Sequence, residues 1–131
     1  GTNSPLVINS QNANGSVNAT ANLTPSFAGN SAVTNWTRNI DFATASRRLT
    51  VTDNFATSAD TQAIFQVNVP VQPTVSGNII TAGALRIRVI TPTSPTINIV
   101  NWRNVDSGEY NSGYKIEITG ASGIFSVELS N

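Results

Sequence analysis

The stretch Leu85-Arg86-Ile87-Arg88-Val89 alternates aliphatic and charged side chains without a break. Successive side chains of a β-strand point to opposite faces, so the aliphatic residues share one face and both arginines share the other. A strand with one apolar and one polar face is typical of an antiparallel sheet that covers a hydrophobic core on one side. The stretch therefore predicts such a strand.

The same period of two continues on both sides of this strand, and no segment carries the apolar stripe of a helix. The expected strands cover residues 5–8, 16–22, 35–42, 47–53, 61–69, 79–81, 85–89, 96–102, 114–119 and 124–129, with a loop over residues 9–15. Two expected hairpins join residues 35–42 to 47–53 and residues 114–119 to 124–129. About ten short strands at regular spacing predict an all-β fold, an antiparallel β-sandwich.

A chain of 131 residues fits a single domain, and we expect residues 1–131 to form one β-sandwich module. The chain begins at Gly1 without a Met or a signal peptide, which indicates a domain excised from a larger exported protein. Its charged fraction is only 11%, about half the usual value, so neutral hydroxyls and amides must cover the surface. Such a surface predicts a secreted, extracellular location.

The composition argues against several classes of function. The chain has no Cys and no His, and therefore lacks the side chains most used as nucleophile, general base or soft metal ligand. Seven basic residues balance seven acidic ones, which argues against nucleic acid as a partner. No stretch approaches the roughly 20 apolar residues of a membrane span, so no membrane partner is predicted. We expect a binding or supporting module that is not an enzyme.

A set of short motifs resembles a known family. The motifs are Ala19-Thr-Ala-Asn-Leu-Thr-Pro-Ser-Phe27, Trp36-Thr-Arg-Asn-Ile-Asp-Phe42, Leu49-Thr-Val-Thr-Asp53, the late Trp102 and Gly113-Tyr-Lys-Ile116. Their order resembles the C-terminal β-sandwich domain of heparinase II/III-like polysaccharide lyases. The resemblance implies an exported protein that acts on acidic polysaccharide. The catalytic Tyr and His of that family lie in preceding domains, so the resemblance implies a neighbouring catalytic domain as a partner and no catalysis here.

Residues 102–114 contain the parts of a sugar-binding site. Sugar recognition needs a flat aromatic ring for the apolar C–H face of the sugar, and planar amides or guanidiniums for its hydroxyls. The chain supplies these groups close together as Trp102, Arg103, Asn104, Tyr110 and Tyr114. Trp102 and Tyr114 could instead plug the end of the sandwich, as large aromatic residues often do.

Arg86 and Arg88 lie two residues apart on one sheet face, roughly 6.5 to 7 Å from each other. Two guanidiniums at this spacing could bind carboxylates of an extended acidic glycan. They could also be solvated charges that pair with Glu117 or Glu128. Together with Lys115, they complete the predicted carbohydrate-binding residues.

Two further charged pairs admit a structural and a functional interpretation. A hairpin tip at residues 44–45 places Arg38 diagonally opposite Asp53, where the pair either holds the strand register or presents Arg38 to a ligand carboxylate. Asp106 and Glu109 share a loop and could ligate Ca²⁺, although solvation is the commoner role of two such acids. No metal or other cofactor is predicted.

These observations lead to one main hypothesis and two alternatives. The main hypothesis is a non-catalytic carbohydrate-binding module that recognises an acidic polysaccharide, xanthan-like or glycosaminoglycan-like, for an exported polysaccharide-degrading enzyme. The alternatives are a purely structural C-terminal sandwich of a lyase and a surface adhesin domain. An exposed strip of aromatic and Arg residues favours binding, whereas a large apolar outer patch favours the supporting domain.

Overall fold

The computed structural model describes residues 4–121 and 123–131. The strands are β1 (Leu6–Gln11), β2 (Val17–Asn22), β3 (Val33–Ala43), β4 (Arg48–Thr57), β5 (Phe65–Val69), β6 (Thr74–Ser76), β7 (Ile79–Ala82), β8 (Leu85–Thr91), β9 (Thr96–Asn101), β10 (Tyr114–Thr119) and β11 (Ile124–Ser130). Two helical turns are also present, the 3-10 turn η1 (Thr24–Phe27) and the α-helical turn α1 (Trp102–Val105). No helix in the described part of the chain has the length and apolar character needed to cross a membrane.

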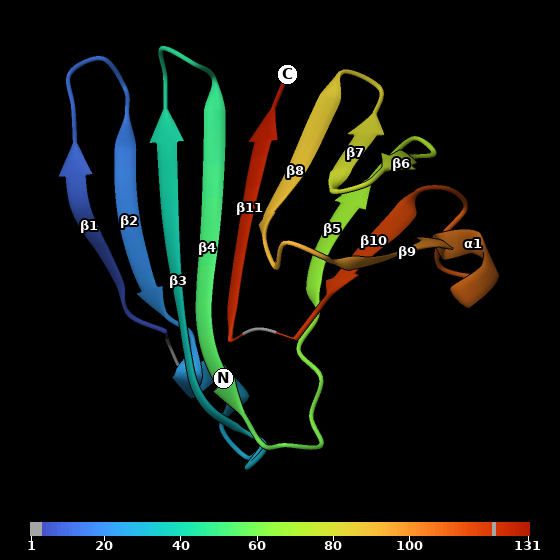
Figure 1. Ribbon diagram of the computed structural model, residues 1–131, viewed down its shortest axis with the longest axis horizontal. Coiled ribbons are helices and arrows are strands. Elements are labelled where there is room, and N and C mark those ends of the chain that lie inside the picture. The colour runs from blue at the N-terminus through green and yellow to red at the C-terminus, as the bar shows by residue number, and fades with distance from the viewer. Residues whose placement is uncertain (1–3, 122) are drawn as a thin grey trace.

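The eleven strands of the described residues form two antiparallel sheets (Figure 1). The larger, sheet A, has the strand order β1-β2-β3-β4-β11-β8-β7-β6, and the smaller, sheet B, has the order β5-β10-β9. Buried side chains from both sheets form one core, so the predicted all-β antiparallel sandwich is confirmed. The sequence did not predict β6, a three-residue edge strand whose side chains are all exposed.

β8 is the strand that the alternating stretch predicts. Ile87 and Val89 are fully buried, whereas Arg86 and Arg88 are exposed on the opposite face. Burial of a large aliphatic side chain stabilises a fold by about 1.5–3 kcal/mol. The inward residues of β8 therefore tie the middle of sheet A to the core.

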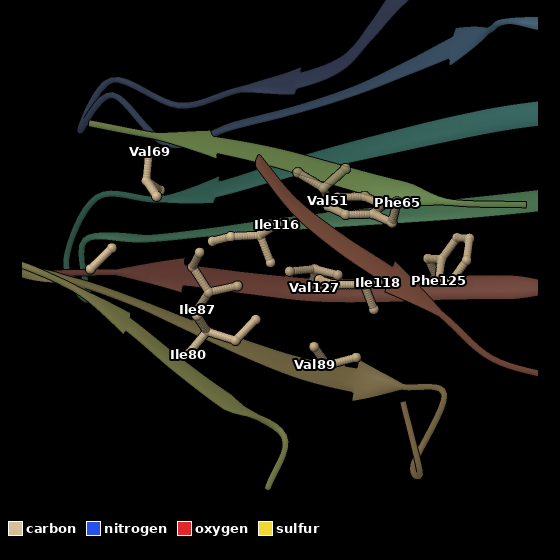
Figure 2. Close-up of a cluster of buried hydrophobic side chains, with 11 residues drawn as sticks. Val51, Phe65, Val69, Ile80, Ile87, Val89, Ile116, Ile118, Phe125 and Val127 are labelled. Atoms are coloured by element: carbon tan, nitrogen blue, oxygen red, sulfur yellow. The ribbon is translucent and has the colours of Figure 1, made fainter. Parts of the chain in front are cut away.

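The core lies between sheet B and the middle of sheet A, as Figure 2 shows. Ile116 and Ile118 of β10 enter it from sheet B, and Phe125 and Val127 of β11 enter it from sheet A. All four side chains are fully buried. β10 is the middle strand of sheet B, and β11 is one of the two middle strands of sheet A.

β10 and β11 do not pair with each other, so the predicted final hairpin is wrong. β10 lies between β5 and β9, whereas β11 lies between β4 and β8. The chain between them crosses from one sheet to the other, and Ser122 in that segment lies outside the described residues. The period of two shows which face of a strand is buried, but it does not show which strand is its neighbour.

Several expected boundaries also differ from the structure, and β4 extends to Thr57, beyond the expected end at residue 53. β1 extends to Gln11 through residues that were expected to form a loop, because it pairs with β2 by backbone hydrogen bonds that need no apolar side chains. β5 begins at Phe65 and not at residue 61, although Ala63 still packs against the core. Trp102 starts α1 where the sequence predicted the end of a strand.

A stack of aromatic rings closes the end of the sandwich next to η1. The ring centroids of Phe27 and Trp36 lie 5.1 Å apart, those of Trp36 and Phe55 lie 4.9 Å apart, and those of Phe55 and Phe125 lie 5.0 Å apart. The rings come from η1, β3, β4 and β11. Offset stacking of this kind adds to the free energy gained from burial, and it anchors η1 to sheet A.

Sheet B covers only part of sheet A, which leaves the side of β1, β2 and β3 without a second layer (Figure 1). In the strand register, Val51 of β4 lies beside Ile40, followed by Ala19 and Ile8. The face that β4 buries therefore continues across β3, β2 and β1. We call this continuation the open face of sheet A. Its large apolar side chains are partly in solvent, and Ile8 is 53% exposed.

A partly buried ion pair marks the boundary between the core and the open face. Arg38 and Asp53 lie directly opposite each other in the register, which corrects the predicted diagonal placement. The reason is that the β3–β4 turn spans residues 44–47, with Arg47 in the left-handed region at φ 51°, so the pairing shifts relative to a two-residue tip. The Nε and Nη2 atoms of Arg38 donate to the two carboxylate oxygens of Asp53 at 2.6 and 2.7 Å.

The environment of this pair is asymmetric. The Asp53 side chain is 0% exposed, whereas the Arg38 side chain is 36% exposed. The hydrogen bond to Asp53 raises the pKa of the Arg38 guanidinium, and it outweighs the opposing effect of burial. The guanidinium also lies over the Phe65 ring, with Cζ 5.4 Å from the ring centroid. Asp53 is thus held behind Arg38, which alone reaches the surface.

We predict that Arg38→Ala lowers the free energy of unfolding by about 3–5 kcal/mol, because it leaves the Asp53 carboxylate buried without its partner. Asp53→Asn should cost less, since Arg38 can turn its charge toward water. The control Arg88→Ala removes a surface pair with Glu128 and should cost less than about 1 kcal/mol. Urea denaturation measures all three, and equal stability of Arg38→Ala and wild type would contradict the structural role.

Candidate functional site

The loop between β9 and β10 begins with α1 and carries aromatic residues of the predicted sugar site. It lies at the end of sheet B where β9 ends and β10 begins (Figure 1). Asn101 caps α1, because its side-chain oxygen accepts a hydrogen bond from the Arg103 N–H at 3.0 Å. The Trp102 N–H donates to the Gly113 carbonyl at 3.1 Å, and the Tyr110 N–H donates to the Asp106 carbonyl at 2.9 Å. These bonds close the loop and bring its aromatic side chains together.

Trp102, Tyr110 and Lys115 form a compact group, which we call the Trp102 cluster. The ring centroids of Trp102 and Tyr110 lie 4.8 Å apart with an interplanar angle of 33°. The Lys115 Nζ lies 5.3 Å from the Trp102 ring centroid, in cation–π range. Trp102 is half-buried by these contacts, whereas Tyr110 is 40% exposed. Tyr110 is therefore the ring most available to a ligand.

A hollow of about 410 Å³ lies beside the cluster. The segment after β5 forms one wall, and the two ends of the aromatic loop form the other. Its polar lining includes Asn101, Arg103, Tyr114, Gln72 and Asn111. Its volume falls within the range of small-ligand sites, and its amides and guanidinium are the donors that sugar hydroxyls and carboxylates accept from.

The predicted binding residues divide between two places. The structure gathers most of them at the aromatic loop and on the strand after it, namely Trp102, Arg103, Asn104, Tyr110, Tyr114 and Lys115. Asn104 is exposed on α1. Tyr114 packs against the hydrophobic core, so its ring has the end-plug role that the sequence left open.

Arg86 and Arg88 do not join this site. They are exposed on the outer face of sheet A, on a strand that pairs with β11 and β7 and not with sheet B. The Arg88 Nη2 lies 3.3 Å from Glu128 Oε2, and the Arg48 Nη1 lies 3.6 Å from the same oxygen. Arg88 thus has the solvated, Glu128-paired role that the sequence offered as the alternative. The two arginines cannot share one small ligand with the Trp102 cluster.

Glu117 and Asn98 lie next to Lys115 of the Trp102 cluster, and the sequence did not predict either of them as a binding residue. Lys115 Nζ lies 2.6 Å from Glu117 Oε1, and the Asn98 amide donates to Glu117 Oε2 at 3.0 Å. These hydrogen bonds, that of Lys115 first, lower the pKa of the Glu117 carboxyl. Apolar and charged side chains alternate from Tyr114 to Ile118. This alternation indicates that Lys115 and Glu117 share the outer face of β10, where they can pair.

Asp106 has a structural role in the aromatic loop. Its Oδ1 accepts hydrogen bonds from the N–H groups of Gly108 and Glu109, both at 3.0 Å. Such an Asx turn uses the carboxylate to shape the backbone. Within residues 4–121 and 123–131, no group of three or more Asp, Glu, His or Cys side chains is placed to hold a metal ion.

Comparison of the chain with protein families gives no match, and neither does comparison with curated proteins. The resemblance to heparinase II/III-like lyases therefore stays a prediction from short motifs. The assignment of a function has to start from the geometry of the Trp102 cluster and of the open face.

We predict that the Lys115–Glu117 pair loses its stabilising effect in acid. Because the folded-state pKa of Glu117 is lowered from its usual 4.5, the stabilisation is full above that value and is lost as the pH falls through the folded-state pKa. Thermal melts between about pH 3 and 7 should show a stability gap between wild type and Glu117→Gln that closes in acid. Asn98→Ala removes only the second donor and should give an intermediate curve. A gap that widens in acid would contradict this assignment.

Proposed function

We propose that this domain is a non-catalytic module that binds an acidic polysaccharide through the Trp102 cluster and the hollow beside it. One observation carries the proposal: the exposed Tyr110 ring, the Trp102 ring and the Lys115 ammonium lie together, and Arg103, next to Trp102 in the chain, lines the hollow. The module would serve an exported polysaccharide-degrading protein, as the resemblance to the lyases implies.

The chemistry of an acidic sugar fits this arrangement in two ways. The face of a pyranose ring is made of C–H groups, which pack well on the electron-rich face of an aromatic side chain. Its carboxylate is attracted to exposed cations, and here Arg103 is exposed while Lys115 is partly exposed. Because Glu117 pairs with Lys115, Arg103 is the cation that is more available to the ligand.

We predict that Tyr110→Ala weakens glycan binding by about 2 kcal/mol, as loss of an aromatic hot spot does, with little change in melting temperature. Tyr110→Phe keeps the ring and is the matched control. Arg103→Ala should weaken binding to acidic glycans only, and added salt should have the same effect because it screens exposed charges. Affinity electrophoresis against xanthan, heparin, alginate and neutral glycans measures these effects.

Two results would contradict the proposal. The first is native binding by a folded Tyr110→Ala, Arg103→Ala double variant, since the site would then lie elsewhere. The second is formation of unsaturated sugar products in proportion to the protein added, which would show a lyase and not a binding module. Trp102→Ala is less informative, because a half-buried ring contributes to stability as well as to binding.

The open face of sheet A favours a second candidate, a supporting domain that packs on a neighbouring domain of the same polypeptide. Leu6, Ile8 and Phe42 are 59%, 53% and 38% exposed, and the register places them on one continuous face. Of the charged residues near its border, Arg38 is neutralised by Asp53, and Arg47 is exposed in the β3–β4 turn next to Phe42. An apolar, uncharged sheet face of this kind suits a large apolar partner surface.

We predict that the double variant Ile8→Ser, Phe42→Ser affects a longer chain more than the isolated domain. The isolated domain should keep its melting temperature nearly unchanged, because both side chains are already partly in water. A chain that retains the neighbouring domain should melt several degrees lower, because the interface loses apolar contacts. Calorimetry of both chains compares the effects. An equal shift in the two chains would show that no neighbour covers this face.

A further inference from the structure

A second concave site lies at the other end of β5 from the hollow beside the Trp102 cluster. It is a groove of about 540 Å³ between η1, the start of β3, the end of β4 and the segment that leads into β5. Gln66 at the start of β5 lines this groove, and Pro70 just after its end lines the hollow. The side chains that matter for its chemistry are Phe27, Trp36, Arg38, Thr61, Gln62 and Gln66.

Arg38 presents a fixed guanidinium to this groove. Its Nε and Nη2 atoms are held by Asp53, and its plane lies over the Phe65 ring. A guanidinium has five N–H donors, so the donors that Asp53 does not use remain at the partly exposed edge of Arg38. Because Asp53 already immobilises the guanidinium, the Arg38 side chain loses little further entropy when a ligand accepts these hydrogen bonds.

The charge around the groove is balanced, which decides the kind of ligand that fits. Asp53 neutralises Arg38 from behind, and the groove has no other charged residue among its described lining side chains. A ligand carboxylate would gain hydrogen bonds but little net electrostatic attraction, since it would meet a pair whose charges cancel. An uncharged acceptor such as a sugar hydroxyl gains the same hydrogen bonds and avoids the loss of hydration that a carboxylate pays.

The remaining lining matches the two kinds of surface on a sugar ring. Phe27 and the exposed Ile64 supply apolar contact for C–H groups. Thr61, Gln62 and Gln66 supply hydroxyl and amide groups, which both donate to and accept from sugar hydroxyls. The volume of the groove lies within the usual range for small-molecule sites.

We propose that this groove binds an uncharged pyranose unit, and that it acts as a second subsite for the glycan whose acidic units bind at the Trp102 cluster. The role as a second subsite rests on the proposed function, whereas binding of a neutral sugar in the groove does not. The two sites then differ in one measurable property. Binding at the Trp102 cluster weakens in salt, and binding in the groove does not.

Titration of the ¹⁵N-labelled domain with cellobiose as the neutral probe and with glucuronate as the acidic probe tests the proposal by NMR. Cellobiose should shift the side-chain amide signals of Gln62 and Gln66, equally at low and high salt. It should also shift the indole N–H signal of Trp36, a buried donor without an acceptor among the described residues. Glucuronate should shift the signals around Tyr110 and Arg103, and salt should reverse these shifts.

Variants then distinguish binding of cellobiose in the groove from NMR signal shifts that have another cause. Gln62→Ala, Gln66→Ala should weaken cellobiose binding about tenfold, because two side-chain hydrogen bonds are lost. Gln11→Ala is the matched control, since Gln11 is an exposed glutamine on β1 and does not line the groove. Arg38→Lys keeps the charge but loses the planar fork, and it should also weaken cellobiose binding provided that the domain still melts cooperatively.

The outcomes distinguish the two proposals. Cellobiose shifts that occur only around the Trp102 cluster, or nowhere at the solubility limit of the sugar, would overturn the groove site. Unchanged cellobiose affinity in the Gln62, Gln66 variant would overturn it as well. Absence of glucuronate shifts at Tyr110 and Arg103 would instead count against the acidic site, and would leave the groove to be judged on cellobiose alone.

Discussion

The ion pair between Arg38 and Asp53 is the interaction on which the arrangement of this domain depends. It joins β3 to β4 at the line where sheet B stops covering sheet A, and its carboxylate is fully buried while its guanidinium reaches the surface. A buried carboxylate is tolerated only when a partner satisfies it, so the pair couples the register of the β3–β4 hairpin to the packing of Phe65 from sheet B. Arg38 of this pair also lines the groove, so the side chain that satisfies Asp53 is the one that we propose for sugar recognition.

The unequal size of the two sheets explains where the domain has surfaces to offer. Three strands cannot cover eight, so the core is confined to the middle of sheet A and the face of β1, β2 and β3 remains open. At one end of sheet B the aromatic loop builds the Trp102 cluster, and at the other end the aromatic stack and η1 border the groove. The open face is apolar, and we propose it for a protein surface, whereas the two concave sites carry amides, rings and guanidiniums, and we propose them for sugars.

The two concave sites differ in the charge that they present to a ligand. Arg103 is exposed at the loop, where its interaction with an anion is long-ranged and screened by salt. Arg38 is already paired, and its free donors act only at hydrogen-bond distance. In our proposal, a polysaccharide with both acidic and neutral units contacts both sites through different parts of its chain. β5 runs between them, and the four steps along the chain from Gln66 to Pro70 cover about 13 Å.

The fold class and the location of most strands follow from the sequence alone, because a period of two reports directly on burial of one face, as in Leu85 to Val89. The sequence also identified the aromatic loop, since Trp102, Tyr110 and Lys115 lie close together in the chain and meet in the structure. The pairing of the strands became visible only in the three-dimensional structure: β10 and β11 both bury alternate side chains in the core, yet they lie in different sheets. The three-dimensional structure alone separated Arg86 and Arg88 from the Trp102 cluster, and it alone assembled the groove from side chains between Leu23 and Gln66. Periodicity describes each strand by itself, whereas partners, open faces and grooves arise from long-range packing that no local pattern encodes.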